Sequence, residues 1–294
     1  MQEDAVAFEG WAFVIYTYYA KEKGLYVQLG LSEKAEEGAR RFSEMGKFLG
    51  KRGHYYRFLY RALKFSEQYS WFSLDKKLSE LTRKFNQYLK SGLTFTNNYP
   101  NGEKLETDFP NNGKVNENDI EGLFALTKPF EMQMFRQLPV GLFEKEKKAE
   151  TSIFTGKKSA IDLWSTKDDK IIIYELKWKH KMIGIITELF FYCNFVRDMY
   201  GAGEEIAKNH FECYKIDGKQ MKEKYRGYDN ICSHKFHEIN GNMLYDAGNL
   251  HPAITKKLLD EMNKAEFVNN EAPIRYGLIE YIVCDGNLKI KSIM

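Results

Sequence analysis

Two carboxylates and one ammonium group lie close together in the segment 160–177. Asp162 is followed by the triplet Glu175-Leu176-Lys177, which ends an apolar run. Two short apolar runs flank a polar centre here, a pattern that predicts a β-hairpin. Side chains alternate along a strand, so Glu175 and Lys177 point to one face, and Asp162 on the neighbouring strand would face Glu175. Because carboxylates are hard oxygen ligands, the pattern indicates a magnesium or manganese site.

This pattern resembles the signature of the PD-(D/E)XK nuclease superfamily, over about residues 118–200. Ile161 stands where the motif has proline, a position that is loose in the superfamily. The resemblance implies that Asp162 and Glu175 hold a divalent metal ion and that the backbone carbonyl of Leu176 is a further ligand. It also implies that Lys177 orients the attacking water or stabilises the transition state.

A plainer interpretation is a solvated strand pair whose charges form a cross-strand ion pair. Residues Ile171 to Tyr174, however, are apolar on both faces of the second strand. Such a run is typical of a covered, central strand. Charges at the end of a covered strand are costly unless a metal or a partner compensates them. The surroundings therefore favour the metal site.

The elements around the hairpin follow the order helix, strand, strand, strand, helix, which is also the order of the nuclease core in that superfamily. We expect one or two short helices over 119–137, a strand over 138–143 and a helix over 184–200, whose apolar residues form a wide stripe. One strand of a later hairpin over 275–293, with Asp-Gly at its turn, could complete the sheet.

An acidic residue on the first helix often adds to the site in this superfamily. The resemblance points to Glu131, in the first turn of a helix that Pro129 would begin, with Glu121 as the second choice. A first-turn glutamate is explained equally well by the helix dipole. Glu188, in the first turns of the helix after Lys177, could face the same cleft, but an ordinary helix-surface position is favoured.

Basic residues near the predicted site are candidates for nucleic-acid contacts. Lys179 and Lys181 follow Lys177 closely, and Arg57 and Arg61 lie on a predicted helix among tyrosines. Such groups would grip phosphates and stack on bases. The alternatives are a solvated loop for the two lysines and core packing for the aromatic residues of the helix.

The chain divides by composition into three parts. Residues 1–93 are predicted to be mostly helical, with helices over 5–20 and 74–89. Residues 94–117 are rich in Asn, Gly and Pro and are predicted to be a linker or loop. Residues 118–294 form the predicted nuclease-like domain, with an insertion around 201–250.

The overall composition limits the setting of the protein. A length of 294 residues with 43% hydrophobic content allows a substantial core, and the net charge of +3 permits a polyanionic partner without requiring one. No apolar run approaches the roughly 20 residues of a membrane span. The cysteines lack paired spacing, and Cys232, His234 and His237 make only part of a zinc set, so we expect reduced thiols in a cytoplasmic protein.

We therefore predict an α/β (α+β) protein with a restriction-endonuclease-like core, a mixed central β-sheet flanked by helices, and an α-rich N-terminal region. The expected activity is that of a metal-dependent endonuclease that uses Mg²⁺ (or Mn²⁺) to hydrolyse DNA, with RNA as the other substrate to test. A homodimer is allowed, and the sequence does not decide between defence and repair. The alternatives are an inactive protein of this fold that binds nucleic acid or assists assembly, and a non-nuclease metal hydrolase.

Overall fold

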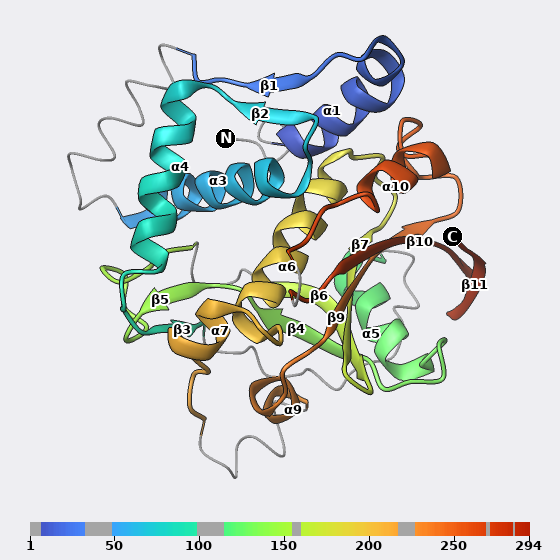
Figure 1. The fold of residues 1–294 in the computed structure, drawn as a ribbon. Helices are drawn as coiled ribbons and strands as arrows, with labels where there is room; N and C mark the ends of the chain where they lie inside the picture. The colour runs from blue at the N-terminus through green and yellow to red at the C-terminus, as the bar shows by residue number, and fades with distance from the viewer. Residues whose placement is uncertain are drawn as a thin grey trace.

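A six-stranded mixed sheet forms the centre of the protein, in the order β11-β10-β9-β7-β6-β4 (Figure 1). The computed structural model describes residues 7–32, 49–98, 115–154, 160–216, 227–268, 271–284 and 286–294. The mixed sheet and the helices around it confirm the predicted mixed α/β class. The strands are β4 (Phe135–Pro139), β6 (Ala160–Lys167), β7 (Lys170–Lys177), β9 (Glu238–Asp246), β10 (Ile274–Cys284) and β11 (Asn287–Ile293).

The middle of the sheet is parallel and its margins are antiparallel. β7, β9 and β10 run parallel, whereas β4 with β6, β6 with β7, and β10 with β11 pair antiparallel. Parallel neighbours need a crossover connection. Helix α6 (Gly184–Tyr200), predicted from its apolar stripe, lies on the connection from β7 to β9, and α10 (Lys256–Met262) lies on the connection from β9 to β10.

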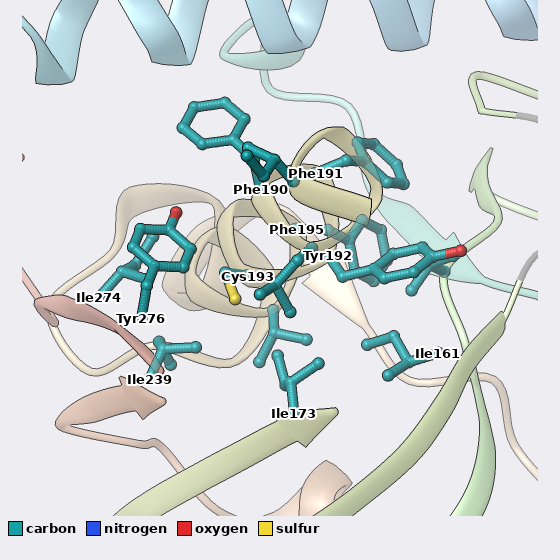
Figure 2. Close-up of a cluster of buried hydrophobic side chains, with 14 of the residues drawn as sticks. Ile161, Ile173, Phe190, Phe191, Tyr192, Cys193, Phe195, Ile239, Ile274 and Tyr276 are labelled. Carbon is teal, nitrogen blue, oxygen red and sulfur yellow. The ribbon is translucent and has the colours of Figure 1, made fainter. Parts of the chain in front are cut away.

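One face of the sheet packs against α6 (Figure 2). Ile173 and Ile239 rise from the sheet towards α6, where Cys193 lies fully buried. At Gly241 of β9, an added Cβ would lie 2.4 Å from the sulfur of Cys193. The helix therefore approaches the sheet as closely as it does because this position has no side chain.

The opposite face packs against α5 (Glu117–Thr127). Ile120 and Phe124 of this helix form a separate apolar cluster with Leu176, Leu244 and other sheet residues. The helix begins with a capping box, in which Asn116 accepts from the Asp119 amide and Asp119 accepts from the Asn116 amide. This cap fixes the start of α5 above the ends of β6 and β7.

The described part of the N-terminal region is mostly helical and packs on the far side of α6. Its apolar residues, such as Phe13 and Phe65, belong to the same cluster as Phe190 of α6, so the two regions share one continuous core. Asp75 caps α4 by accepting a hydrogen bond of 2.7 Å from the Leu78 amide. The elements are α1 (Phe8–Ile15), η2 (Tyr16–Ala20), η3 (Lys21–Lys23), β1 (Val27–Leu29), α3 (Leu49–Gln68), β2 (Phe72–Leu74) and α4 (Lys76–Leu89).

Three features differ from the sequence-based expectations. The segment predicted as an insertion around 201–250 contains β9, which lies between β7 and β10 in the sheet. The second short helix before residue 137 is absent, because the chain bends after α5 and enters β4. The predicted strand over 138–143 is divided, since β5 (Leu142–Glu144) joins a separate small sheet with β3 (Phe95–Asn97) and β8 (Phe211–Glu212). Most of the predicted linker, residues 99–114, lies outside the described residues.

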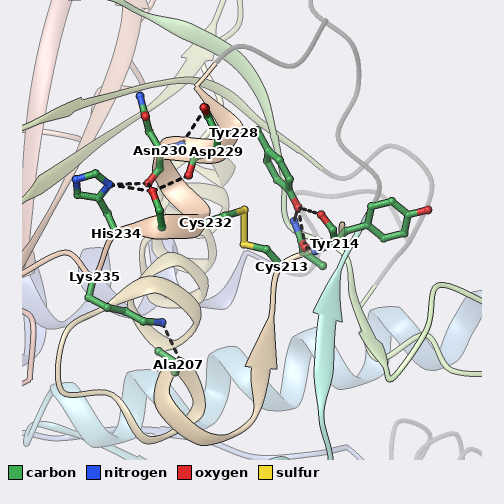
Figure 3. Close-up of a disulfide and its surroundings, with 11 residues drawn as sticks. Ala207, Cys213, Tyr214, Tyr228, Asp229, Asn230, Cys232, His234 and Lys235 are labelled. Carbon is green, nitrogen blue, oxygen red and sulfur yellow. Dashed lines mark hydrogen bonds between the residues drawn. A yellow bond between two sulfur atoms is a disulfide. The ribbon is translucent and has the colours of Figure 1, made fainter. Parts of the chain in front are cut away.

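A disulfide corrects the prediction of reduced thiols. Cys213, just after β8, is bonded to Cys232 in α9 (Tyr228–Ser233), near the short helix α7 (Glu205–Asn209) (Figure 3). This pairing also removes Cys232 from any zinc set. Cys193 and Cys284 are free, the first buried and the second exposed. Within the described ranges, no helix is both long and apolar enough to cross a membrane.

Candidate active site

The β6–β7 ladder stops before the carboxyl end of β7, and the candidate residues lie where the two strands part. The last paired residues are Leu163 and Tyr174. Beyond them, the carboxylate of Asp162 accepts a hydrogen bond of 3.0 Å from the backbone N–H of Leu176. The N–H and C=O of one residue point to the same neighbouring strand. The Leu176 carbonyl is therefore directed towards the Asp162 side of β7 as well.

Lys177 lies between two carboxylates on the face that packs against α6. Its Nζ is 2.8 Å from Glu175 and 2.9 Å from Glu188, which lies in the second turn of α6. The Glu175 side chain is only 3% exposed and that of Lys177 is 15% exposed. Glu188 therefore belongs to the cluster, whereas the sequence analysis favoured a helix-surface position over the cleft.

The two carboxylates of the motif are held where negative charge is unfavourable. Burial and the nearby Glu121 carboxylate raise the pKa of Asp162 to about 7, although Lys177 and the Leu176 N–H act in the opposite direction. Burial and the Asp162 carboxylate raise the pKa of Glu175 well above its usual range. The Asp162 charge thus acts on Glu175, and Lys177 lowers the pKa of both carboxylates, so the two lie in one cluster.

The pKa values of Lys177 and Glu188 are shifted in the directions that keep both side chains charged. Burial alone would lower the pKa of Lys177, but Glu175, Glu188 and Asp162 outweigh it and raise that pKa. Burial alone would raise the pKa of Glu188, but the Lys177 ammonium outweighs it and lowers that pKa. Lys177 is therefore charged and fixed, and Glu188 is its ionised partner.

Glu121 of α5 is the fourth carboxylate of the cluster. It is 3% exposed and accepts hydrogen bonds from Arg136 at 3.1–3.2 Å and from Gln137 at 3.0 Å. Burial raises the pKa of Glu121, and the same carboxylate contributes to the raised pKa of Asp162. Gln137 has a positive φ of 59° within β4, a conformation that residues other than glycine seldom adopt.

The structure places Glu131 away from this cluster and corrects its assignment. It lies in a bend between α5 and β4, exposed, with a φ of 57°. The helix that would have carried it does not form. Of the two acidic candidates in this segment, the second choice, Glu121, is the one that shares a cluster with Asp162.

The oxygen atoms of the cluster fit a hard divalent cation. In the described ranges, no three His, Cys, Asp or Glu side chains are already arranged around a common metal position. However, Oε2 of Glu175 is buried without a hydrogen-bond donor among the described residues. Two carboxylates with raised pKa values, an oxygen without a donor and a carbonyl directed to the same side form a donor set that magnesium or manganese prefers. Asp162, Glu175 and the Leu176 carbonyl are therefore the residues that would hold the ion.

The four predicted nucleic-acid contacts fall into different environments. Lys179 and Lys181 are exposed beside the site, and Lys179 Nζ lies 4.9 Å from the centre of the Trp178 ring. Arg57 is half-buried and its guanidinium lies 4.0 Å above the ring of Phe191. Its charge contributes to the lowered pKa of Glu188, so it borders the site.

Arg61 is a structural residue, which corrects its prediction as a nucleic-acid contact. It is 5% exposed, and its Nε lies 3.3 Å from the carboxylate of Glu9 in α1. Glu9 also accepts a hydrogen bond of 3.0 Å from Thr187 of α6. The Glu9–Arg61 pair therefore connects α1, α3 and α6 in the interior, where a phosphate cannot reach it.

Comparison with known proteins gives no relative for this chain. No protein-family model matches it, and neither a curated protein nor a solved structure is significantly similar to it.

Tyr192 and Glu188 of α6 show which signal the sequence analysis missed. They are four residues apart, so they share a helix face. Burial and the Glu175 carboxylate raise the pKa of Tyr192, which places the ring beside the cluster. Polar residues at helical spacing within an otherwise buried helix were the available signal, because such residues need a partner inside the protein.

Proposed function

We propose that the protein is a divalent-metal-dependent nuclease that hydrolyses phosphodiester bonds, with DNA as the expected substrate and RNA as the second. The observation that carries this proposal is the convergence of Asp162, Glu175 and Lys177 where β6 and β7 separate. The restriction-endonuclease-like assignment of the fold belongs to the same proposal. It is supported by a mixed sheet with α5 and α6 packed on opposite faces.

The proposed chemistry divides between the ion and the side chains. A divalent ion held by Asp162, Glu175 and the Leu176 carbonyl would neutralise charge on the phosphate and lower the pKa of a bound water. Lys177 donates hydrogen bonds to the attacking water or to the phosphate oxygen that gains charge. Glu188 would keep Lys177 protonated and in position when the Glu175 carboxylate coordinates the ion.

The polyanionic substrate is held by cations at the edge of the site. Lys179 and Lys181 are exposed, and a lysine ammonium group only donates hydrogen bonds, so both side chains suit phosphate oxygens. Arg57 adds a planar guanidinium from α3 next to Glu188. The helical N-terminal region thereby contributes to substrate binding through Arg57.

The test is cleavage of DNA and RNA by the purified protein with Mg²⁺ or Mn²⁺, compared with the same protein in EDTA. We expect Lys177→Ala to reduce the cleavage rate by about 10²–10³-fold, the usual cost of losing one transition-state donor. Lys170→Ala is the matched control, since Lys170 is a half-exposed lysine at the other end of β7, paired with Glu238 at 3.0 Å. Metal-independent cleavage, or equal rates for the wild type and both variants, would contradict the proposal.

A second candidate function is nucleic-acid binding without cleavage. It is favoured by one observation, that Lys177 is ion-paired with both Glu175 and Glu188, so two of its three N–H donors are already used within the protein. This candidate predicts metal-independent binding of DNA or RNA and intact substrate after long incubation with Mn²⁺. Hydrolysis of small phosphate diesters in preference to polynucleotides would instead favour a different metal hydrolase.

A further inference from the structure

A groove of about 290 Å³ lies on the sheet face opposite to the candidate active site. Its floor is made by positions that are paired across three strands. Ile172, Asn240 and Arg275 form one row, and Tyr174, Asn242 and Gly277 form the next. Tyr174 belongs to the apolar cluster under α5, whereas Glu175 points to the other face. The groove therefore begins on the face that α5 covers, beside the residues that the helix protects.

Three polar side chains of this floor have no partner among the residues that the structure describes. Asn240 and Asn242 are half-buried and Arg275 is exposed, and none of the three side chains hydrogen-bonds or ion-pairs with another described residue. The polar atoms of such half-buried amides hydrogen-bond with water or, when one is bound, with a ligand. Together they offer a guanidinium with donors only and two carboxamides with both donors and acceptors.

Gly277 shapes the floor between these groups. A Cβ at this position would lie 2.4 Å from Oδ1 of Asn242. Any larger residue would displace the Asn242 amide from its place over β10. The absence of a side chain at Gly277 therefore leaves space for the Asn242 carboxamide. Glycine in a strand is also found where a ligand approaches the backbone closely.

The opposite wall is aromatic and apolar. Phe130 is half-buried and stacks in parallel on Tyr174, with ring centres 5.5 Å apart. Met132, Ile279 and Ile293 also line the groove. The groove thus combines polar side chains that can hydrogen-bond with a ligand and an aromatic surface on which a planar ring can pack.

We propose that this groove binds a single nucleotide. The base would pack against the wall at Phe130 and hydrogen-bond with Asn240 and Asn242, since carboxamides match the donor and acceptor pattern of a base edge. Arg275 would bind the phosphate through its guanidinium fork. A volume near the lower end of the usual range for ligand sites suits one nucleotide and little more. The same chemistry is offered by a free mononucleotide and by one nucleotide of a single strand. This inference does not depend on the proposed nuclease activity.

The experiment is calorimetric titration of the full chain in EDTA, so that the candidate active site holds no metal. The probes are the nucleoside 5′-monophosphates, the matching nucleosides, inorganic phosphate and a short single-stranded oligonucleotide. Arg275→Gln should weaken nucleotide binding by at least about tenfold, because a charge-assisted hydrogen bond is lost. Asn242→Leu should weaken it while leaving phosphate unaffected. Lys289→Gln removes the same charge from an exposed position on the neighbouring strand β11 and should change nothing.

Each outcome decides the inference. Mononucleotide binding that depends on Arg275 identifies a free nucleotide as the ligand, and binding of the oligonucleotide alone with the same dependence identifies a nucleotide within a strand. Either supports the site. No binding of any nucleotide at millimolar concentration, equal effects of Arg275→Gln and Lys289→Gln, or inorganic phosphate binding as tightly as nucleotide would overturn it. Repeating the titration with Glu175→Gln separates this site from the nuclease proposal, since that variant should bind normally.

Discussion

The Asp162 carboxylate lies where burial and a neighbouring carboxylate make its ionisation unfavourable. Its carboxylate is fixed by the Leu176 N–H at 3.0 Å, yet Glu121 and burial raise its pKa to about 7. The same group would have a pKa near 3.9 in the unfolded chain, so folding takes up a proton between about pH 4 and pH 7. The metal-free protein must therefore lose stability as the pH rises through this range, and a bound cation would restore it.

We predict that Asp162→Asn raises the melting temperature of the metal-free protein at pH 8 by several degrees and changes it little at pH 4.5. At pH 8 the wild-type carboxylate is ionised in an unfavourable place, and the amide removes that charge while it keeps the shape. Saturating Mg²⁺ should stabilise the wild type at pH 8 and leave Asp162→Asn unchanged. Differential scanning fluorimetry over pH checks this. A variant that is less stable than the wild type at pH 8 would show that Asp162 is ionised in a favourable place.

The strands and helices position these residues by departing from regular pairing. β6 and β7 are both eight residues long, but they pair only up to Leu163 and Tyr174, and the remaining ends separate around Asp162. Helix α6 supplies Glu188 to one side of this opening, and α5 supplies Glu121 to the other. The site is therefore assembled from four elements, with the break in the ladder as its centre.

The buried Glu9–Arg61 pair connects α1, α3 and α6, so we expect it to contribute to the packing of these three helices. Arg61→Ala should lower the free energy of unfolding by about 3–5 kcal/mol, because it leaves the buried Glu9 carboxylate without its partner. Arg57→Ala, the matched control four residues earlier on the same helix, should lower it much less but weaken nucleic-acid binding. Urea unfolding and binding titrations measure the two effects. Equal stabilities for the two variants would contradict the structural role of Arg61.

The sequence predicted the elements with strong local signals and missed those that depend on tertiary contacts. The hairpin of β6 and β7, the hairpin of β10 and β11, and helix α6 follow from apolar periodicity and turn residues. β9 was missed because its Asn and Gly positions interrupt the apolar pattern, and they are used for close packing against α6 and for the groove on the other face.

The residues of the candidate site divide in the same way. Asp162, Glu175 and Lys177 could be selected from their spacing, since alternation in a hairpin brings them together. Glu121 was only the second choice and Glu188 was placed mainly on a helix surface, because their part in the cluster depends on how two helices pack on opposite faces of the sheet. Glu131 was preferred over Glu121 because Pro129 suggested a helix start, whereas the chain forms a bend with a positive φ at Glu131.

At the scale of the whole molecule, one core joins the helical N-terminal region to the sheet. A disulfide links the segment after β8 to α9 at the periphery. Cys213 and Cys232 are 19 residues apart. We predict that Cys213→Ser lowers the free energy of unfolding by about 3 kcal/mol, because a cross-link of this length restricts the unfolded chain. A reducing agent should have the same effect on the wild type and none on the variant. Identical thermal unfolding of the wild type with and without reductant would show that the bond does not form in the purified protein.

The central claim is that a divalent cation binds where β6 and β7 separate. It is tested most directly by a crystal structure of the protein soaked with Mn²⁺ at pH 8, with anomalous differences collected at the manganese edge. We predict a peak within coordinating distance of Asp162, Glu175 and the Leu176 carbonyl, with Lys177 still held by Glu188. Full manganese saturation of the crystal with no peak at these residues, or with a peak only elsewhere, would contradict the account.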